Sequence, residues 1–261
     1  MTSSSRSTRV LATAALIAAA SPLFAQLGPP ATSTNLPPEI LSLACAPRAT
    51  YEDPATPLRI TGGQDSFIRR IHAPGDLVTI NAGKANGIEV GQEFYVRRLQ
   101  TSDRAPVSRQ APATIRTSGW IKVYAVDDQW SLVTVTHACD TIEIGDYLEP
   151  FALPTLPPTP KDRPKAQRNN YAKVVRGNDR RTAFSQGDYL IINRGSDHGI
   201  EVGSQFVIYR NKNQAENFLF ELGEGIAVDV KPELTTLRVT MSLDAIRSGD
   251  LVALRREPEE K

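Results

Sequence analysis

Short apolar runs separated by glycine-rich turns dominate the chain after its first quarter. In one such run Leu237, Val239 and Met241 alternate with Arg238 and Thr240, which is the period of a half-buried strand. No helical periodicity of ten or more residues occurs outside the extreme N-terminus. The pattern predicts short strands joined by glycine turns, and therefore an all-β fold.

One stretch of the chain occurs twice. Gly75 to Arg98 and Gly187 to Arg210 are identical at 12 of 24 positions without a gap. Five or six short strands in each copy predict a small barrel, because closure removes exposed strand edges. We expect structural roles in turns for the shared polar and glycine positions, which are Gly75, Asp76, Asn81, Gly83, Gly87 and Gly91 in the first copy and Gly187, Asp188, Asn193, Gly195, Gly199 and Gly203 in the second.

The repeat divides the chain into two domains. We expect a first β-barrel repeat over residues 45–151 and a second over residues 170–256, followed by a tail over residues 257–261. Residues 152–169 form a Pro-rich basic linker, which we expect to be extended because proline fixes φ and has no N–H to donate. The predicted fold is therefore all-β, with two homologous small β-barrels in tandem joined by this linker.

Residues 1–25 have the features of a cleaved signal peptide. Arginines precede an apolar run from Val10 to Ala20, and Ala25 ends a segment with proline and small residues. The run is shorter than the roughly 20 apolar residues of a membrane-spanning helix, so we expect no transmembrane segment after cleavage. Residues 26–44 are rich in proline and are expected to be a disordered tether. The mature protein is then periplasmic or secreted.

Cys45 and Cys139 are the only cysteines in the sequence. An even pair in an oxidising compartment favours a disulfide. Free or intermolecular thiols are one alternative, and lipidation of Cys45 is another. The lipidation signal is incomplete, because Ser42 stands where a branched apolar residue is required. A disulfide between residues this far apart would contribute at most about 4–5 kcal/mol.

The charge balance gives no reason to expect nucleic acid as a partner. The formal net charge is +1, and removal of residues 1–25 leaves 28 basic against 29 acidic residues. One stretch, Lys161 to Arg181, carries eight Lys and Arg against two Asp. It is either a solvated linker or a contact for anionic wall polymer or lipid headgroups.

Four aspartates follow a glycine and directly precede a strand. We expect their carboxylates to accept hydrogen bonds from nearby backbone N–H groups rather than to form an acid/base or Ca²⁺ cluster. These residues are Asp76, Asp146, Asp188 and Asp250. No phosphate-binding loop and no nucleophile elbow occurs in the sequence. We therefore expect no catalytic residue, no cofactor and no enzymatic activity.

The three histidines are too scattered to predict a metal site. His137 is expected on the inner face of a strand with Val133 and Val135, as a core histidine with a hydrogen-bond partner. His198 aligns with Asn86 in the glycine turn, where a left-handed conformation is expected for it. His72 has no predicted partner.

The motif Gly-Asp-x-x-x-Ile-Asn-x-Gly-x-x-x-Gly-Ile-x-x-Gly-x-x-Phe, followed by Gly-x-x-x-Val and Gly-Asp, resembles small β-barrel modules of bacterial envelope proteins. It is similar to the C-terminal module of flagellar assembly protein T and to LysM-associated modules, and more loosely to the barrels of the rod shape-determining protein C. The resemblance covers about residues 57 to 256 and implies a scaffolding role without a common ligand. The chain has no LysM-like segment and no coiled coil, so a flagellar or cell-shape role does not follow.

These observations predict a non-enzymatic interaction or scaffolding protein of the bacterial cell envelope, with an envelope protein as its partner. The alternative is a wall-polysaccharide (peptidoglycan) binding protein that uses the basic linker and exposed aromatic residues among Trp120, Tyr124 and Trp130. Only the first copy carries a long polar loop, Leu99 to Ser118. We expect this loop to make the specific contact, because recognition residues concentrate on loops of rigid scaffolds.

Overall fold

A computed structural model describes residues 36–52, 54, 56–64, 68–100, 112–158, 162–167, 169–178, 181–211 and 218–256. The expected signal peptide, most of the expected tether and the expected tail lie outside the described residues. The regular structure of the described chain is mainly β-strand, with one α-helix, α1 (Pro38–Ala44). None of the helices within those residues has the length and apolar character needed to cross a membrane.

The first sheet is antiparallel and has the strand order β2-β4-β7-β6-β5-β9, with β1 paired to β6. A separate two-stranded sheet pairs β3 with β8, and the 3₁₀ helix η1 (Lys84–Asn86) follows β4. The strands are β1 (Arg48–Thr50), β2 (Ile60–Gly63), β3 (Ile71–His72), β4 (Leu77–Ile80), β5 (Glu93–Gln100), β6 (Ala113–Val126), β7 (Ser131–Ala138), β8 (Ile142–Glu143) and β9 (Tyr147–Pro150).

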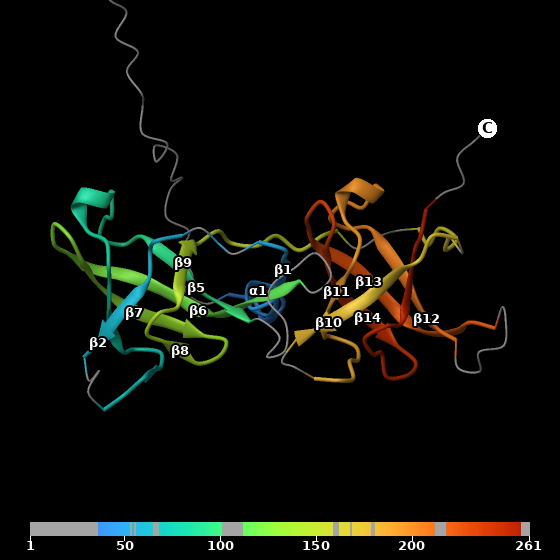
Figure 1. Cartoon of the computed structure of the whole chain (residues 1–261), viewed down its shortest axis with the longest axis horizontal. Helices are drawn as coiled ribbons and strands as arrows, with labels where there is room; N and C mark the ends of the chain where they lie inside the picture. The colour runs from blue at the N-terminus through green and yellow to red at the C-terminus, as the bar shows by residue number, and fades with distance from the viewer. Residues whose placement is uncertain are drawn as a thin grey trace, which may run out of the picture.

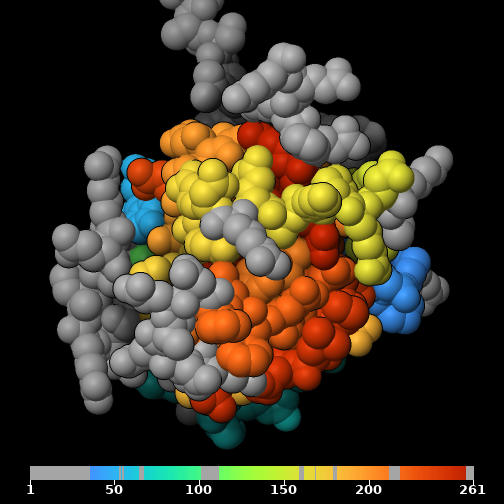
Figure 2. Space-filling model, turned by 90° about the vertical axis from the view of Figure 1, so that its right-hand side faces the viewer, coloured from blue at the N-terminus to red at the C-terminus, as the bar shows by residue number. Residues whose placement is uncertain are grey.

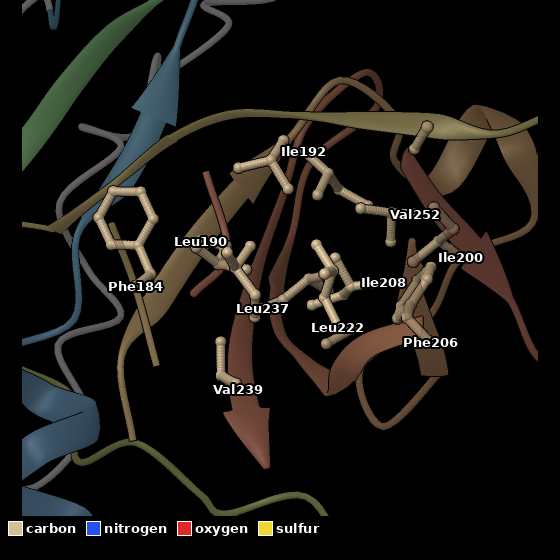
Figure 3. Packing of buried hydrophobic residues seen from close by; sticks show 14 residues of the cluster. Phe184, Leu190, Ile192, Ile200, Phe206, Ile208, Leu222, Leu237, Val239 and Val252 are labelled. Carbon is tan, nitrogen blue, oxygen red and sulfur yellow. The ribbon is translucent and has the colours of Figure 1, made fainter. Parts of the chain in front are cut away.

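The rest of the chain forms a closed barrel with the strand order β10-β11-β14-β13-β12-β15. The 3₁₀ helix η3 (Ser196–His198) follows β11, as η1 follows β4. The strands are β10 (Ala172–Gly177), β11 (Tyr189–Ile192), β12 (Gln205–Arg210), β13 (Phe220–Val230), β14 (Thr235–Ser242) and β15 (Leu251–Leu254). The barrel interior is filled by buried apolar side chains (Figure 3), among them Phe184, Leu190, Ile192, Ile200, Phe206, Ile208, Leu222, Leu237, Val239 and Val252.

The first sheet repeats the strand order of the barrel but closes less completely. In the barrel, β10 pairs with β15 through Ala172 and Lys173. In the first sheet, the edges at β2 and β9 are joined by an isolated bridge, Arg59 to Tyr147, and by three neighbouring backbone hydrogen bonds but no paired ladder. The predicted all-β fold with a closed barrel is thus confirmed for the second copy, whereas the ladder that would close the first is reduced to a bridge.

Residues 36–52, hereafter the N-terminal segment, lie between the first sheet and the barrel (Figure 1). The segment contains α1 and β1, and β1 adds to the first sheet by pairing with β6. Helix α1 begins with Pro38, a position where proline loses no intrahelical hydrogen bond. Leu43 and Ala44 are buried. The prediction of a disordered tether is therefore wrong for residues 38–44, because these apolar side chains find partners that lie far away in the sequence.

The segment that was expected to be an extended Pro-rich linker lies partly on the barrel. Figure 2 shows it, in yellow, crossing the barrel surface. Ala166 forms a bridge with Arg255 at the end of β15, and the N–H of Gln167 donates to the carbonyl of Leu254 (2.9 Å). Ala166 also packs against the buried Tyr209 on the outer side of the barrel. These contacts give residues 162–167 a fixed course on the barrel.

The predicted loop Leu99 to Ser118 is shorter in the structure than in the prediction. β5 continues to Gln100 and β6 begins at Ala113, with Leu99 paired to Ile115 and Gln100 paired to Thr114. Residues 101–111 lie outside the described residues. The polar sequence hid this extension, because the start of β6 is buried by pairing with β1, which lies more than sixty positions earlier in the chain.

Candidate functional site

The closed barrel has an apolar outer face that the chain covers itself. Leu43, Ala46 and Ala49 of the N-terminal segment pack against this face, and the hydroxyl groups of Ser42 and Tyr189 share a hydrogen bond of 3.0 Å. Residues of β11 and of the β13–β14 hairpin form the face. We call it the covered face; it consists of Tyr189, Ile191, Val228 and Leu234.

The hairpins of the two sheets can be matched residue by residue. Trp130 directly precedes β7 as Leu234 directly precedes β14. In each turn the carbonyl oxygen of this residue accepts a backbone hydrogen bond, from Asp127 to Trp130 (2.9 Å) and from Lys231 to Leu234 (2.8 Å). The pairing of the two hairpin strands also stops at equivalent residues. The last pair before the turn is Val126 with Ser131 in the first sheet and Val230 with Thr235 in the barrel. The counterparts of the covered face in the first sheet are therefore Leu77, Thr79, Tyr124 and Trp130.

We call these four residues the open face. Within the described residues, no segment buries the rings of Tyr124 and Trp130. Tyr124 is 66% exposed and Trp130 is 48% exposed, whereas Leu234 in the covered face is 3% exposed. Large aromatic side chains are strongly stabilised by burial and are enriched where proteins bind one another. The open face is consequently our candidate functional site.

The turn beside the open face is held by close backbone contacts. The N–H groups of Lys84 and Ala85 in η1 donate to the carbonyls of Asp127 (2.9 Å) and Asp128 (3.1 Å). A Cβ atom on Gly83 would lie 2.1 Å from the carbonyl oxygen of Asp127, so only glycine fits at this position. Its counterpart Gly195 approaches the carbonyl of Lys231 in the same way. The hairpin that carries Trp130 is thus positioned by the repeated glycine motif.

The other turn residues singled out by the sequence also serve the backbone. The Oδ1 atoms of Asn81 and Asn193 accept the N–H of Arg59 and of Lys173, each at 2.7 Å. Gly87 and Gly199 end the two 3₁₀ helices in the left-handed conformation. Positive φ angles also occur at the remaining turn glycines, Gly75, Gly91, Gly187 and Gly203.

Each aspartate of the four Gly-Asp pairs accepts a hydrogen bond from the backbone N–H three positions earlier. The distances are 2.9 Å at Asp76 and Asp146, 2.8 Å at Asp188 and 2.7 Å at Asp250. The carboxylates therefore cap four separate turns and do not converge on one site. The sequence reasoning missed that each also has an arginine partner, namely Arg69, Arg98, Arg181 and Arg210 respectively.

A pocket of about 380 Å³ on the first sheet is rich in arginine. Arg98 donates to both carboxylate oxygens of Asp146 (2.6 and 2.8 Å), and this hydrogen bonding raises the pKa of Arg98. Arg59 donates to the carbonyl of Gly145 (2.8 Å). The guanidinium groups of Arg98 and Arg59 are therefore hydrogen-bonded within the fold. The lining residues are Pro54, Arg59, Arg97, Arg98, Leu99, Gly145, Asp146 and Tyr147.

Arg97 is buried and connects the first sheet to the N-terminal segment. Its guanidinium lies 4.1 Å from the ring centroid of Tyr95 and hydrogen-bonds to Thr117, whose hydroxyl donates to the carbonyl of Ala46 (3.3 Å). Its Nε lies 3.4 Å from Glu149. Burial lowers the pKa of Arg97. The contacts with Tyr95, Thr117 and Glu149 give this side chain a structural role.

The predicted disulfide between Cys45 and Cys139 is confirmed, and it ties the N-terminal segment to the end of β7. His137 stacks on Trp120 with ring centroids 4.4 Å apart, and burial lowers the pKa of His137. The prediction that His137 faces the core beside Val135 is wrong. A register shift pairs Trp120 with His137 but Ile121 with Val135, so the histidine lies with the outer residue of β6.

Two further sequence expectations need correction. His198 ends η3 and does not adopt the left-handed conformation, which Gly199 takes instead. Trp120 is 1% exposed and packs with Tyr95 and Phe151, so it cannot contribute to an exposed aromatic surface. His72 is buried in β3, against Gly63. Among the described residues, the three histidines do not converge.

The N-terminal segment is the structural element that sequence reasoning missed. A signal was present, because Leu41, Leu43, Ala46 and Ala49 are apolar and recur every two or three residues. No protein-family model matches the chain, and no curated protein shows significant similarity to it. The resemblance to modules of flagellar assembly protein T and to LysM-associated modules therefore stays a prediction.

Proposed function

We propose that the chain is a non-enzymatic interaction or scaffolding protein of the bacterial cell envelope. In this proposal it is exported through a cleaved signal peptide and consists of two homologous barrel modules in tandem, joined by the Pro-rich segment. The common strand order and the matched turns support a duplication. The disulfide supports an oxidising compartment, because such bonds persist there.

The observation that carries the proposal is the difference between the covered face and the open face. On the barrel this surface packs against apolar side chains of the N-terminal segment. On the first sheet the same surface exposes Tyr124 and Trp130. A surface that packs against another segment of the same chain in the barrel, and is exposed with two aromatic rings in the first sheet, supports binding of a protein partner by the first copy.

Site-specific photo-crosslinking in the native envelope tests this proposal. A photoreactive amino acid at position 124 should give a discrete crosslinked species. The matched control is position 202, because Val202 is 55% exposed on the barrel. Crosslinks of equal yield at both positions, or none at position 124, would argue against recognition by the open face.

Wall-polysaccharide binding is the second candidate, and the same aromatic residues favour it. Exposed aromatic rings can stack on sugars, and the exposed carboxyl groups of Asp127 and Asp128 stand in the adjoining turn. Purified peptidoglycan distinguishes the two candidates. Retention that persists in high salt and is lost in a Trp130→Ala variant would favour the polysaccharide, whereas no retention would favour a protein partner.

The Leu99 to Ser118 region of the first copy was predicted to contact the partner. We keep the prediction that the first copy makes the specific contact, now with the open face as its main surface. Residues 101–111, which lie outside the described residues, remain a second predicted contact. The basic stretch from Lys161 to Arg181 retains its predicted contact with anionic polymer as an alternative to a structural role.

A further inference from the structure

One corner of the first sheet brings together two cysteines and a histidine. Cys45 follows α1, Cys139 follows β7, and His137 stands two residues before Cys139. The ligand atoms of the three side chains all lie within 4.8 Å of one another. The Cα atoms of the cysteines are 5.7 Å apart, and stacking on Trp120 holds the imidazole in place.

The donor set is chemically suited to a thiophilic metal ion. Two thiolates and one imidazole are preferred ligands of Zn²⁺, and they leave a fourth tetrahedral position open. All three side chains are partly buried, so water does not fully surround them. The cysteines are joined in the structure, and these sulfur atoms become metal ligands only as thiolates.

The barrel offers an internal comparison. The N–H of Cys139 donates to the carbonyl of Ser118 (2.9 Å), as the N–H of Leu243 donates to the carbonyl of Leu222 (2.7 Å). Met241 occupies the position of His137. The barrel therefore builds the same backbone corner without a cysteine or a histidine. The fold of this corner does not require the three potential ligands.

We propose that reduction of the Cys45–Cys139 disulfide converts this corner into a Zn²⁺ site with the two sulfur atoms and a ring nitrogen of His137 as ligands. A dithiol reductant supplies two electrons and two protons, which cleave the S–S bond and leave two thiols, while the reductant becomes a disulfide. Binding of Zn²⁺ then releases both thiol protons. The N-terminal segment thus stays attached to β7 in both states, by a disulfide or by a metal ion.

Titration of the full chain with Zn²⁺ tests the proposal. The protein, produced without affinity histidines, is reduced with a phosphine under anaerobic conditions, and a chromophoric chelator reports free Zn²⁺. The reduced chain should bind one Zn²⁺, and the oxidised chain none. Co²⁺ in place of Zn²⁺ should give a thiolate charge-transfer absorption band, which reports sulfur ligation directly.

Two histidine variants make the test specific. His137→Ala should weaken binding by at least about tenfold, since even loss of a residue that only supports a ligand has an effect of this size. His198→Ala is the matched control, because His198 is exposed in η3, and it should leave binding unchanged. Circular dichroism follows the β fold in every sample.

Three results would overturn the proposal. The first is a reduced chain that binds no Zn²⁺. The second is a His137→Ala variant that binds Zn²⁺ as tightly as the unaltered chain, which would mean that the cysteines act without the imidazole. The third is a β spectrum that disappears on reduction and does not return when Zn²⁺ is added.

Discussion

The hydroxyl of Thr236 donates a buried hydrogen bond of 3.0 Å to the carbonyl oxygen of Pro47, which lies 189 positions earlier in the chain. Thr236 belongs to β14 of the barrel, and Pro47 lies in the N-terminal segment directly before β1. Arg48 lies near acidic groups on both sides, 3.5 Å from Glu149 and 3.8 Å from Asp229. The N-terminal segment therefore joins the first sheet to the barrel.

Thr236→Val should lower the free energy of unfolding by about 1–3 kcal/mol, because the shape is kept while the buried carbonyl of Pro47 loses its donor. Urea denaturation followed by circular dichroism measures the change. Thr240→Val on the same strand is the control, since Thr240 is exposed and its replacement should have little effect. Equal effects of the two substitutions would mean that the contact with Pro47 contributes nothing.

Replacement of Cys45 and Cys139 by serine should destabilise the protein by up to about 4–5 kcal/mol, because the bridge closes a long loop, with a sequence separation of 94. Thermal unfolding of the variant beside the unaltered chain gives the difference. Hydrogen exchange should show the largest loss of protection in α1 and β1. Unchanged protection there would contradict the view that the disulfide holds the N-terminal segment in place.

Asp146→Asn should cost about 1–3 kcal/mol, because the carboxylate is 3% exposed and its loss removes the two-point partner of Arg98, which keeps only its contact with Glu143 (2.7 Å) as an ion pair. Asp76→Asn is a matched change in the same kind of turn. Its carboxylate is 29% exposed and lies 3.8 Å from Arg69, so the loss should be below about 1 kcal/mol. Chemical denaturation of both variants checks this order, and a reversed order would refute it.

Stability should depend on the protonation of His137. Burial lowers the pKa of His137 from its usual value of 6.5, so the folded state disfavours the imidazolium more than the unfolded chain does. The stability contributed by neutral His137 is complete above the pKa that His137 has in the unfolded chain. It is lost as the pH falls through the lower pKa that His137 has in the folded protein. The free energy of unfolding should change less between about pH 7.5 and about pH 5 in a His137→Phe variant than in the unaltered chain. The phenylalanine keeps an aromatic ring on Trp120 but does not titrate. An identical pH dependence for variant and unaltered chain would contradict this assignment.

The sequence predicted those features that depend on local chemistry. Gly83 and Gly195 recur because a backbone carbonyl passes too close for a side chain, and Asp146 recurs with Asp250 because each caps a turn. Such constraints act within a few residues or between neighbouring strands. They leave a repeated pattern that can be recognised without a structure.

The features that the sequence did not predict depend on distant contacts or on local irregularity. The side chains of Leu43 and Ala49 become buried only after the barrel presents Tyr189 and Ile191. A register shift in the pairing of β6 with β7 removes His137 from the core. Alternation along one strand cannot show such a shift. The open face likewise became visible only by comparing the exposure of equivalent positions in the first sheet and the barrel.

The measurement that tests the central claim most directly is quantitative co-purification of crosslinked partners from the native envelope with a Tyr124→Ser, Trp130→Ser variant. The control is a Val202→Ser, Leu243→Ser variant, which removes two exposed apolar side chains from the barrel instead. We predict that the first variant keeps its melting temperature and loses the partner, while the control retains it. Partner recovery that is undiminished in the first variant and lost in the control would place recognition on the barrel and contradict the account.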